Sequence, residues 1–285
     1  MDAAETSLWV LALDADSWLS CAPSQPSAAL KINGTALKCS HCGSSNTIRA
    51  HLIPRVLAKE VQVGHAHAVT KADGAISQIS QSGIFDPDIL CGPCDEKLGL
   101  LEEKAAQLFT AVRNQAQGLR EGAIVKLPRQ DDDLLRFYAA LLWKYSITRP
   151  EFGRVELGKF QEPLRAVSFG SDAIPEFLDV ALFRLRLDIN DTGVFAYRAP
   201  SPDRKLGINL YRILVGGVLA LVKVDRRPWG DRLTSELGVR GRGEVRAAVA
   251  AAKEFEEFKM AQKLAHTKPK VSSFLDKQDN VALNT

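Results

Sequence analysis

Four of the five cysteines form two C-x-x-C pairs, and these residues have the clearest capacity for chemistry. Cys39 and Cys42 lie in "CSHCGS", Cys91 and Cys94 lie in "CGPC", and 48 residues separate the two pairs. Zinc prefers four tetrahedral sulfur or nitrogen ligands, which two such pairs supply when they meet in space. Glycine and proline in and beside the pairs favour the tight turns that this requires. The spacing predicts a structural zinc held by all four cysteines.

Other interpretations of these residues stay open. The four thiols could simply be buried in an ordinary core. "CGPC" also resembles a thioredoxin-like redox motif, and "DILCGPCDEKLGLL" fits its strand-then-helix context, although the first pair and the lack of a surrounding βαβ pattern argue against it. His41 lies inside the first pair and could replace a cysteine. His65 and His67 are expected to lie in a solvated polar loop.

The order of these motifs resembles a known family. At "CSHCGSSNTIRAHLIPRVLAKE … GIFDPDILCGPCDEKLG" the chain resembles the zinc-knuckled HNH endonucleases, above all a bacterial branch with a cysteine pair, "HIIPK" or "HIIPR", and a second pair before a helix. The resemblance covers about residues 37–117. "LLRFYAALLWKYSIT … FGRVELGKFQEPLR" resembles the helical extension of that branch, which continues the match to about residue 170.

The resemblance implies a ββα-metal module in which zinc lies beside the catalytic centre. His51 matches the first motif histidine, which acts as a general base on water. A divalent ion, commonly Mg²⁺ and alternatively Mn²⁺, binds the scissile phosphate and stabilises developing charge. A neutral imidazole near pH 7 suits the role of base. Implied activity is phosphodiester hydrolysis in DNA, or in RNA, and the resemblance associates it with phage defence or a mobile element.

Several positions depart from the family pattern. Ala50 replaces the acidic or histidine ligand that often precedes the base, and the middle asparagine is missing. Asp95 occupies the last motif position, so Asp95, assisted by Asp88 or Asp86, is the candidate magnesium ligand. The alternative is a catalytically degenerate zinc module that binds nucleic acid or a protein partner, with His51 bracing the turn before Pro54.

The rest of the chain predicts an α+β fold in which helices and a small antiparallel sheet follow the zinc module. "GVFAYRA", "LGINLYRIL" and "GVLALVKVD" have strand-like composition between turn residues. Apolar periodicity predicts helices near residues 94–117, 131–147, 162–167, 174–184 and 244–263. We expect four regions: a loosely ordered segment 1–30, the zinc module 31–117, a helical and sheet region 118–265, and a frayed tail 266–285.

The distribution of charge along the chain indicates which part would contact a nucleic acid. Residues 1–99 contain seven Lys/Arg and ten Asp/Glu, whereas the remainder contains 30 and 24. Phosphate contacts are therefore expected mainly from the C-terminal part, with DNA favoured over RNA. No convincing signal peptide or membrane-length apolar run is seen, and paired cysteines of this kind favour metal binding in the cytoplasm. The candidate phosphate-binding residues are Arg49, Arg55, Arg226, Arg227, Arg240 and Arg242.

Overall fold

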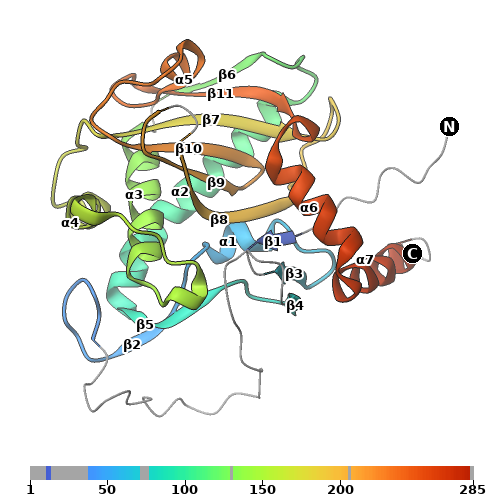
Figure 1. Cartoon of the computed structure of the whole chain (residues 1–285), viewed down its shortest axis with the longest axis horizontal. Helices are drawn as coiled ribbons and strands as arrows, with labels where there is room; N and C mark the ends of the chain where they lie inside the picture. The colour runs from blue at the N-terminus through green and yellow to red at the C-terminus, as the bar shows by residue number, and fades with distance from the viewer. Residues whose placement is uncertain (1–10, 14–37, 71–76, 129–130, 205–206, 283–285) are drawn as a thin grey trace.

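A large twisted sheet and a separate two-stranded sheet organise the chain (Figure 1). The computed structural model describes residues 11–13, 38–70, 77–128, 131–204 and 207–282 of the 285-residue chain. The nine strands of the large sheet follow the order β4-β3-β1-β8-β9-β10-β7-β11-β6. Its strands are β1 (Leu11–Leu13), β3 (His67–Thr70), β4 (Ser77–Ser80), β6 (Ile124–Pro128), β7 (Leu178–Arg186), β8 (Ala196–Asp203), β9 (Leu210–Val215), β10 (Val218–Val224) and β11 (Glu244–Ala251).

Neighbouring strands of the large sheet are mostly antiparallel. The exceptions are β1, which is parallel to both β3 and β8, and β11, which is parallel to β7. Strands β8, β9 and β10 form the predicted three-stranded antiparallel unit. The sheet is larger than predicted, because that unit is extended on both sides by strands from distant parts of the chain.

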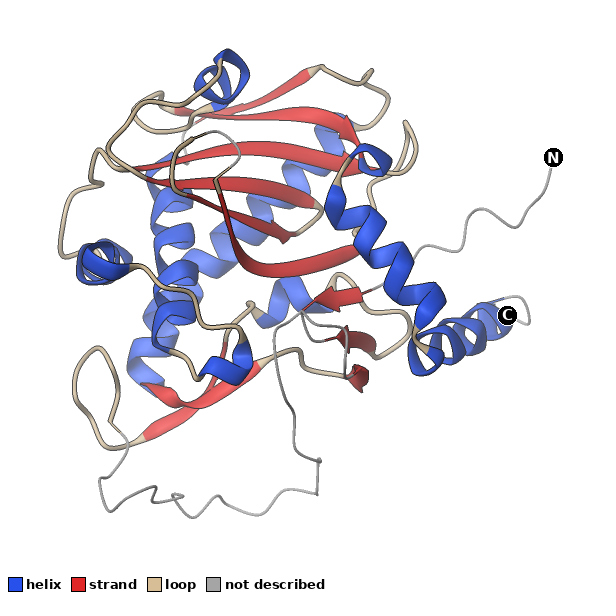
Figure 2. Cartoon of the chain, in the orientation of Figure 1, coloured by secondary structure: helices blue, strands red, loops and turns tan. Residues whose placement is uncertain are grey.

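The second sheet pairs β2 (Thr47–His51) with β5 (Phe85–Cys91), and α2 begins directly after β5. Long helices lie across both faces of the large sheet (Figure 2). No helix in the described ranges is long and apolar enough to cross a bilayer. The helices are α1 (Arg55–Lys59), α2 (Gly92–Ala116), α3 (Asp131–Ile147), α4 (Gln161–Ser168), α5 (Arg232–Leu237), α6 (Glu256–Thr267) and α7 (Pro269–Ala282), with short 3-10 turns at Pro150–Phe152, Gly158–Phe160 and Ala252–Glu254.

Two apolar cores lie on opposite faces of the large sheet. Successive side chains of a strand point to opposite faces, and in β7 Val180 and Leu182 join one core while Ala181 and Phe183 join the other. The larger core contains buried residues of α2, α3 and α4 and continues to the cysteines beside the two-stranded sheet. The smaller core contains buried residues of α6 and α7. The predicted boundary at residue 117 coincides with the end of α2, and the larger core continues across it.

Helical periodicity correctly located the three helices that contribute to the larger core. The predicted segments 94–117, 131–147 and 162–167 correspond to α2, α3 and α4. Three aspartates occupy the first turn of α3, where they face the positive end of the helix dipole. The general α+β class is therefore confirmed.

Two predicted helices are wrong. Segment 174–184 contains β7, and segment 244–263 contains β11 followed by the start of α6. All residues of β7 from Val180 to Arg186 are buried, because both faces of this central strand are covered. A continuous apolar run of that kind cannot be told from a buried helix by periodicity alone. β11 misleads in the same way, because its alanines carry no preference for strands.

The two ends of the chain also differ from the prediction. Segment 266–285 was expected to fray, but α7 occupies most of it, and Val271 and Leu275 are buried in the smaller core. Most of segment 1–30 lies outside the described residues. Its described part, Leu11–Leu13, forms β1 and pairs with two strands of the large sheet.

A buried carboxylate attaches α6 to the large sheet. Glu257 is fully buried and accepts hydrogen bonds from Arg212 Nε at 2.8 Å, from Arg212 Nη2 at 2.7 Å and from Arg198 Nη1 at 3.0 Å. Burial alone would raise the pKa of Glu257, but the hydrogen bonds and charge of Arg212 overcome this and leave the pKa below its usual value. The pair of arginines comes from β8 and β9, so this clamp joins three elements.

We predict that Glu257→Ala lowers the free energy of unfolding by about 3–5 kcal/mol, because it leaves two largely buried guanidinium groups without their partner. Urea denaturation followed by circular dichroism measures this. The matched control is Glu254→Ala, since Glu254 is exposed in the turn before α6, and its effect should stay within about 0.5 kcal/mol. A loss below about 1 kcal/mol for Glu257→Ala would contradict the assignment of the clamp.

Candidate metal centre and the histidine beside it

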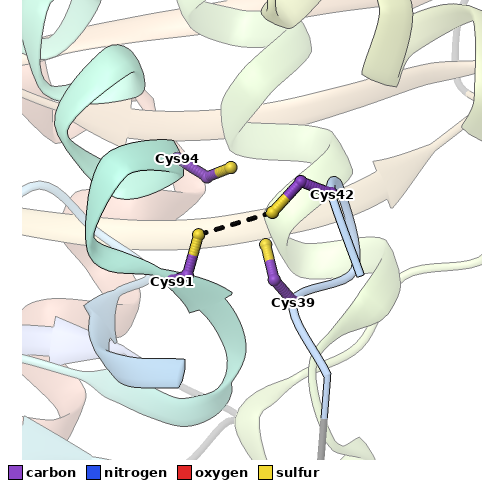
Figure 3. A group of neighbouring side chains, drawn as sticks. All are labelled: Cys39, Cys42, Cys91 and Cys94. Carbon is purple, nitrogen blue, oxygen red and sulfur yellow. Dashed lines mark hydrogen bonds between the residues drawn. The ribbon is translucent and has the colours of Figure 1, made fainter. Parts of the chain in front are cut away.

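The four paired cysteines converge on one point (Figure 3). Their sulfur atoms all lie within 4.8 Å of one another, and Cys42 Sγ is 3.6 Å from Cys91 Sγ. Four sulfurs around a tetrahedral zinc lie about 3.8 Å apart when each zinc–sulfur bond is about 2.3 Å long. The cluster therefore fits a tetrahedral metal ion. It is also the one such group of three or more metal-ligating side chains found in the described part of the chain.

Two turns present these sulfurs. In the first, Gly43 N donates to Cys39 O at 2.9 Å, and Gly43 adopts a φ of 75°, which glycine tolerates without strain. In the second, Cys91 ends β5 and precedes the first turn of α2, which places Cys94 about one turn further on. The metal ligands thus join a loop before β2 to the junction of β5 and α2.

The pKa values of the thiols indicate that this cluster cannot hold several thiolates without a bound cation. Burial raises the pKa of Cys91 and of Cys94 above the usual thiol value, and the neighbouring thiols raise that of Cys94 further. Burial also acts to raise the pKa of Cys39, but backbone N–H groups of Cys42, Cys91 and His41 lower it to about 6. Several adjacent buried thiolates need a positive ion to compensate their charge.

His41 contacts α4 and lies outside the sulfur cluster. Its ring stacks on Phe169 at 3.5 Å between centroids, and its Nδ1 lies 2.9 Å from Arg165 Nη1. Arg165 in turn pairs with Glu162. Burial and the charge of Arg165 lower the pKa of His41. The first cysteine turn is therefore linked to α4 by an aromatic contact.

His51 lies at the end of β2, in the same small sheet as Cys91 but at the end opposite to it, because Thr47 pairs with Cys91 and His51 with Phe85. The ring of His51 is half-buried. Nε2 is inaccessible to solvent and has no hydrogen-bond partner among the described residues. Burial lowers the pKa of His51, and the charges of Lys144 and Arg55 lower it further against the opposing effect of Glu102. The ring is therefore neutral at pH 7, as a general base requires.

A buried lysine connects His51 to α2. Lys144 Nζ, which is 1% exposed, donates to His51 O at 2.7 Å and to Glu102 Oε1 at 2.6 Å. Asp95 belongs to the same group: burial raises its pKa, Lys144 lowers it and Glu102 raises it again. Asp95 and Glu102 are seven residues apart on α2, which places both on one helix face. His51 and Asp95 therefore share the same two charged neighbours.

The sequence did not indicate Lys144 or Glu102 as members of this group. Lys144 reads as an ordinary surface cation near the end of an amphipathic helix, and Glu102 as an exposed position on α2. Only the packing of α2 against α3 brings them to the end of β2. The position of Glu102, two turns after Asp95 on the same helix, is the sequence signal that could have indicated this group.

Asp88 and Asp86 belong to a different group. Asp86 is fully buried and accepts hydrogen bonds from Thr148 Oγ1 at 2.5 Å and from Arg149 N at 3.2 Å. Asp88 Oδ2 lies 3.9 Å from Arg149 Nε, and burial followed by the charge of Asp86 raises the pKa of Asp88. Asp88 therefore has Asp86 and Arg149 as its charged neighbours, whereas Asp95 has Lys144 and Glu102. Asp86 fixes the segment after α3.

Ala50 has a structural explanation. Its side chain is fully buried in the larger core and pairs with Asp86 across the small sheet. A carboxylate at this position would be buried among apolar groups, which is costly without a paired cation. The residue before His51 therefore faces the core in this fold.

The candidate phosphate-binding arginines differ in their availability. Arg49 and Arg55 are exposed, and the Arg49 guanidinium lies 3.6 Å from the centroid of the Phe85 ring. Arg227 pairs with Asp225 at 2.6 Å, and Arg242 donates to two carbonyl oxygens at the end of α5, those of Gly238 and Ser235. Arg226 and Arg240 are exposed, and among the described residues no acidic side chain pairs with either.

His67 does not lie in a solvated loop as predicted. It is fully buried in β3, and its Nε2 lies 3.1 Å from the Tyr197 hydroxyl oxygen. Burial lowers the pKa of His67 to about 4, so the ring is neutral at pH 7. His65, two residues earlier, is exposed as expected.

Comparisons with known proteins add no name to this geometry. No protein-family model, curated protein or solved structure matches the chain.

We predict one tightly bound metal ion per chain, with zinc preferred by a four-thiolate set. Cys94→Ser should lower the metal content well below one and lower the melting temperature, because the apo cluster leaves buried thiols uncompensated. Inductively coupled plasma mass spectrometry on purified protein measures the content. Cys21→Ser and His41→Ala are the controls and should retain the metal. Full metal content in Cys94→Ser, or loss of metal in His41→Ala, would contradict the four-cysteine site.

Proposed function

We propose that this chain is a metal-dependent nuclease of the HNH type, with a structural zinc at the four cysteines. The observation that carries the proposal is a neutral His51 at the end of β2, joined through Lys144 to Glu102 on α2, with Asp95 on the same helix face and the four cysteines at the other end of the small sheet. The order of elements supports it as well, since two antiparallel strands precede a helix that begins at the second cysteine pair.

His51 takes the role of general base in this proposal. Its lowered pKa keeps the ring neutral at pH 7, so Nε2 can accept a proton from water. Nε2 is inaccessible in the structure, so substrate binding must open the end of β2 to water before the base can act. The hydrogen bond from Lys144 Nζ to His51 O fixes the backbone of His51. The opening must therefore involve the groups that cover its ring.

Asp95 would hold the divalent ion, with Glu102 as a further carboxylate on the same face of α2. Mg²⁺ is often bound by one or two carboxylates together with substrate phosphate oxygens and water. When bound, such an ion polarises the scissile phosphate and stabilises the negative charge that develops on it. Lys144 offsets the charge of Asp95 and Glu102 in the absence of the ion. Asp88 has no part in this site, because its partners are Asp86 and Arg149.

DNA is the proposed substrate, in the cytoplasm, with phage defence or a mobile element as the setting that the resemblance favours. Arg49 and Arg55 flank His51 and are the arginines best placed to contact a phosphate at that site. Arg226 and Arg240 are candidates for more distant contacts, whereas Arg227 and Arg242 are engaged within the protein.

A second candidate is a zinc module that binds nucleic acid or a protein partner without cutting. A specific observation favours it: the buried ammonium group of Lys144 already supplies a positive charge between His51 and the carboxylates of α2. Ala50 and the inaccessible Nε2 point the same way. In this case His51 braces the turn before Pro54.

We predict that the purified protein nicks supercoiled plasmid DNA with Mg²⁺ or Mn²⁺ and that His51→Ala lowers the rate by about 10²-fold or more, because the general base is removed. Agarose gel electrophoresis of time courses measures the rate. His65→Ala is the matched control, since His65 is an exposed histidine in the same part of the chain and should leave cutting unchanged.

Asp95→Asn separates the two candidates further. For a nuclease it should raise the metal concentration needed for half-maximal cutting while the zinc content stays at one per chain. Cutting that survives in His51→Ala would reject the base assignment. No cutting of DNA or RNA by wild-type protein that carries its zinc would favour the non-catalytic module.

A further inference from the structure

A recess at the far end of β9 and β10 is separate from the cysteine cluster and from His51. Its volume is about 630 Å³, which falls within the range of small-molecule sites. The turns between α3 and α4 line one side, and the ends of β8, β9 and β10 line the other. None of its lining residues belongs to the metal centre or to the group around Lys144.

Among the described residues, the cations that line this recess are Arg154, Lys159 and Arg204. Arg154 pairs loosely with the largely exposed Glu156 at 3.8 Å. Lys159 and Arg204 are exposed, and no carboxylate among the described residues pairs with either of them. The remaining acid of the lining, Asp203, pairs with Arg212 at 3.5 Å. The recess therefore presents uncompensated positive charge, which attracts an anion.

The walls of the recess are aromatic and apolar. Phe160 is half-buried there, with the Lys159 ammonium 5.4 Å from its ring centroid. Tyr211 forms the floor and donates its hydroxyl hydrogen to Glu156 O at 2.8 Å, which ties the two sides together. Arg204 and Tyr211 both line this recess, so a cation and an aromatic ring belong to the same space. Aromatic side chains and arginine planes bind the flat face of a base.

The recess is also lined by an exposed side-chain amide. Asn209 lines it and is exposed, and its backbone N–H is occupied by Asp225 Oδ2 at 2.8 Å, which fixes the residue at the start of β9. A side-chain amide offers both a donor and an acceptor, the combination that reads the edge of a nucleobase. The cations suit a phosphate group, and the aromatic walls suit the flat face of a nucleobase. The amide suits the hydrogen-bonding edge of the same base, so one nucleotide could use all three.

We propose that this recess binds a nucleoside monophosphate unit, with Lys159 and Arg204 on the phosphate and Phe160, Tyr211 and Asn209 on the base. The unit could be a free nucleotide or one nucleotide of a single strand, since both present the same chemistry. The proposal does not depend on the nuclease activity, because it involves none of the residues around His51.

Isothermal titration of the full, zinc-loaded chain with adenosine 5′-monophosphate in EDTA-free buffer without Mg²⁺ tests this proposal. We expect saturable binding of one ligand per chain with a Kd below about 1 mM, and at least about tenfold weaker binding of adenosine and of inorganic phosphate. The double variant Lys159→Gln/Arg204→Gln should weaken binding at least about tenfold.

The matched control is Lys253→Gln/Lys263→Gln, which removes two exposed cations from the region of α6 and should leave the Kd unchanged. Circular dichroism verifies that both double variants fold. A 5′-phosphorylated single-stranded oligodeoxyadenylate distinguishes the sources: binding about tenfold tighter than the mononucleotide, lost in the first double variant, identifies a strand, and equal affinity identifies a free nucleotide.

The proposal is overturned if adenosine monophosphate shows no saturable binding, if inorganic phosphate binds as tightly, or if the first double variant binds like wild type. His51→Ala should bind the nucleotide normally. Failure of DNA cutting therefore leaves this result unaffected, and loss of nucleotide binding leaves the assignment of the base unaffected.

Discussion

Four sulfur atoms within 4.8 Å of one another are the constraint on which the functional half of the structure depends. They join a loop near residue 40 to the junction of β5 and α2, although about 50 residues separate the two cysteine pairs. The same loop places His41 against Phe169 of the segment after α4. A metal ion in this cluster would therefore fix β5, the start of α2 and the surface of α4 relative to one another, and β2 with them through its pairing to β5.

Buried charges continue this organisation away from the cysteines. Lys144 binds the backbone of His51 and the carboxylate of Glu102, so it couples the end of β2 to α2 and α3. Glu257 couples β8 and β9 to α6 on the other face of the sheet. Each of these charges is acceptable in the interior because its partner is opposite in sign and within hydrogen-bond distance. The two groups have different consequences: Glu257 attaches a helix to the sheet, whereas Lys144 contacts His51, a neutral histidine at the end of β2.

Residue spacing was sufficient to predict the cysteine cluster and the three helices that pack around it. C-x-x-C pairs are short and local, and α2, α3 and α4 have clear apolar faces. The nine-stranded sheet was not predictable in the same way, because β7 is buried on both faces and loses the alternation that identifies a strand, and β11 is rich in alanine, which carries no preference for strands. The group around Lys144 also required the structure, since its members come from three elements whose packing is set by long-range contacts. His67 was predicted to lie in a solvated loop because its neighbours in the sequence are polar. It is instead buried next to the Tyr197 hydroxyl group.

The central claim is that the four cysteines bind zinc and thereby build the site around His51. X-ray absorption spectroscopy at the zinc edge of the purified protein tests it most directly. The structure predicts four sulfur neighbours at about 2.3 Å and no nitrogen or oxygen in the first coordination shell. A spectrum with three sulfurs and one nitrogen at about 2.0 Å, or protein that folds fully without zinc, would contradict the account.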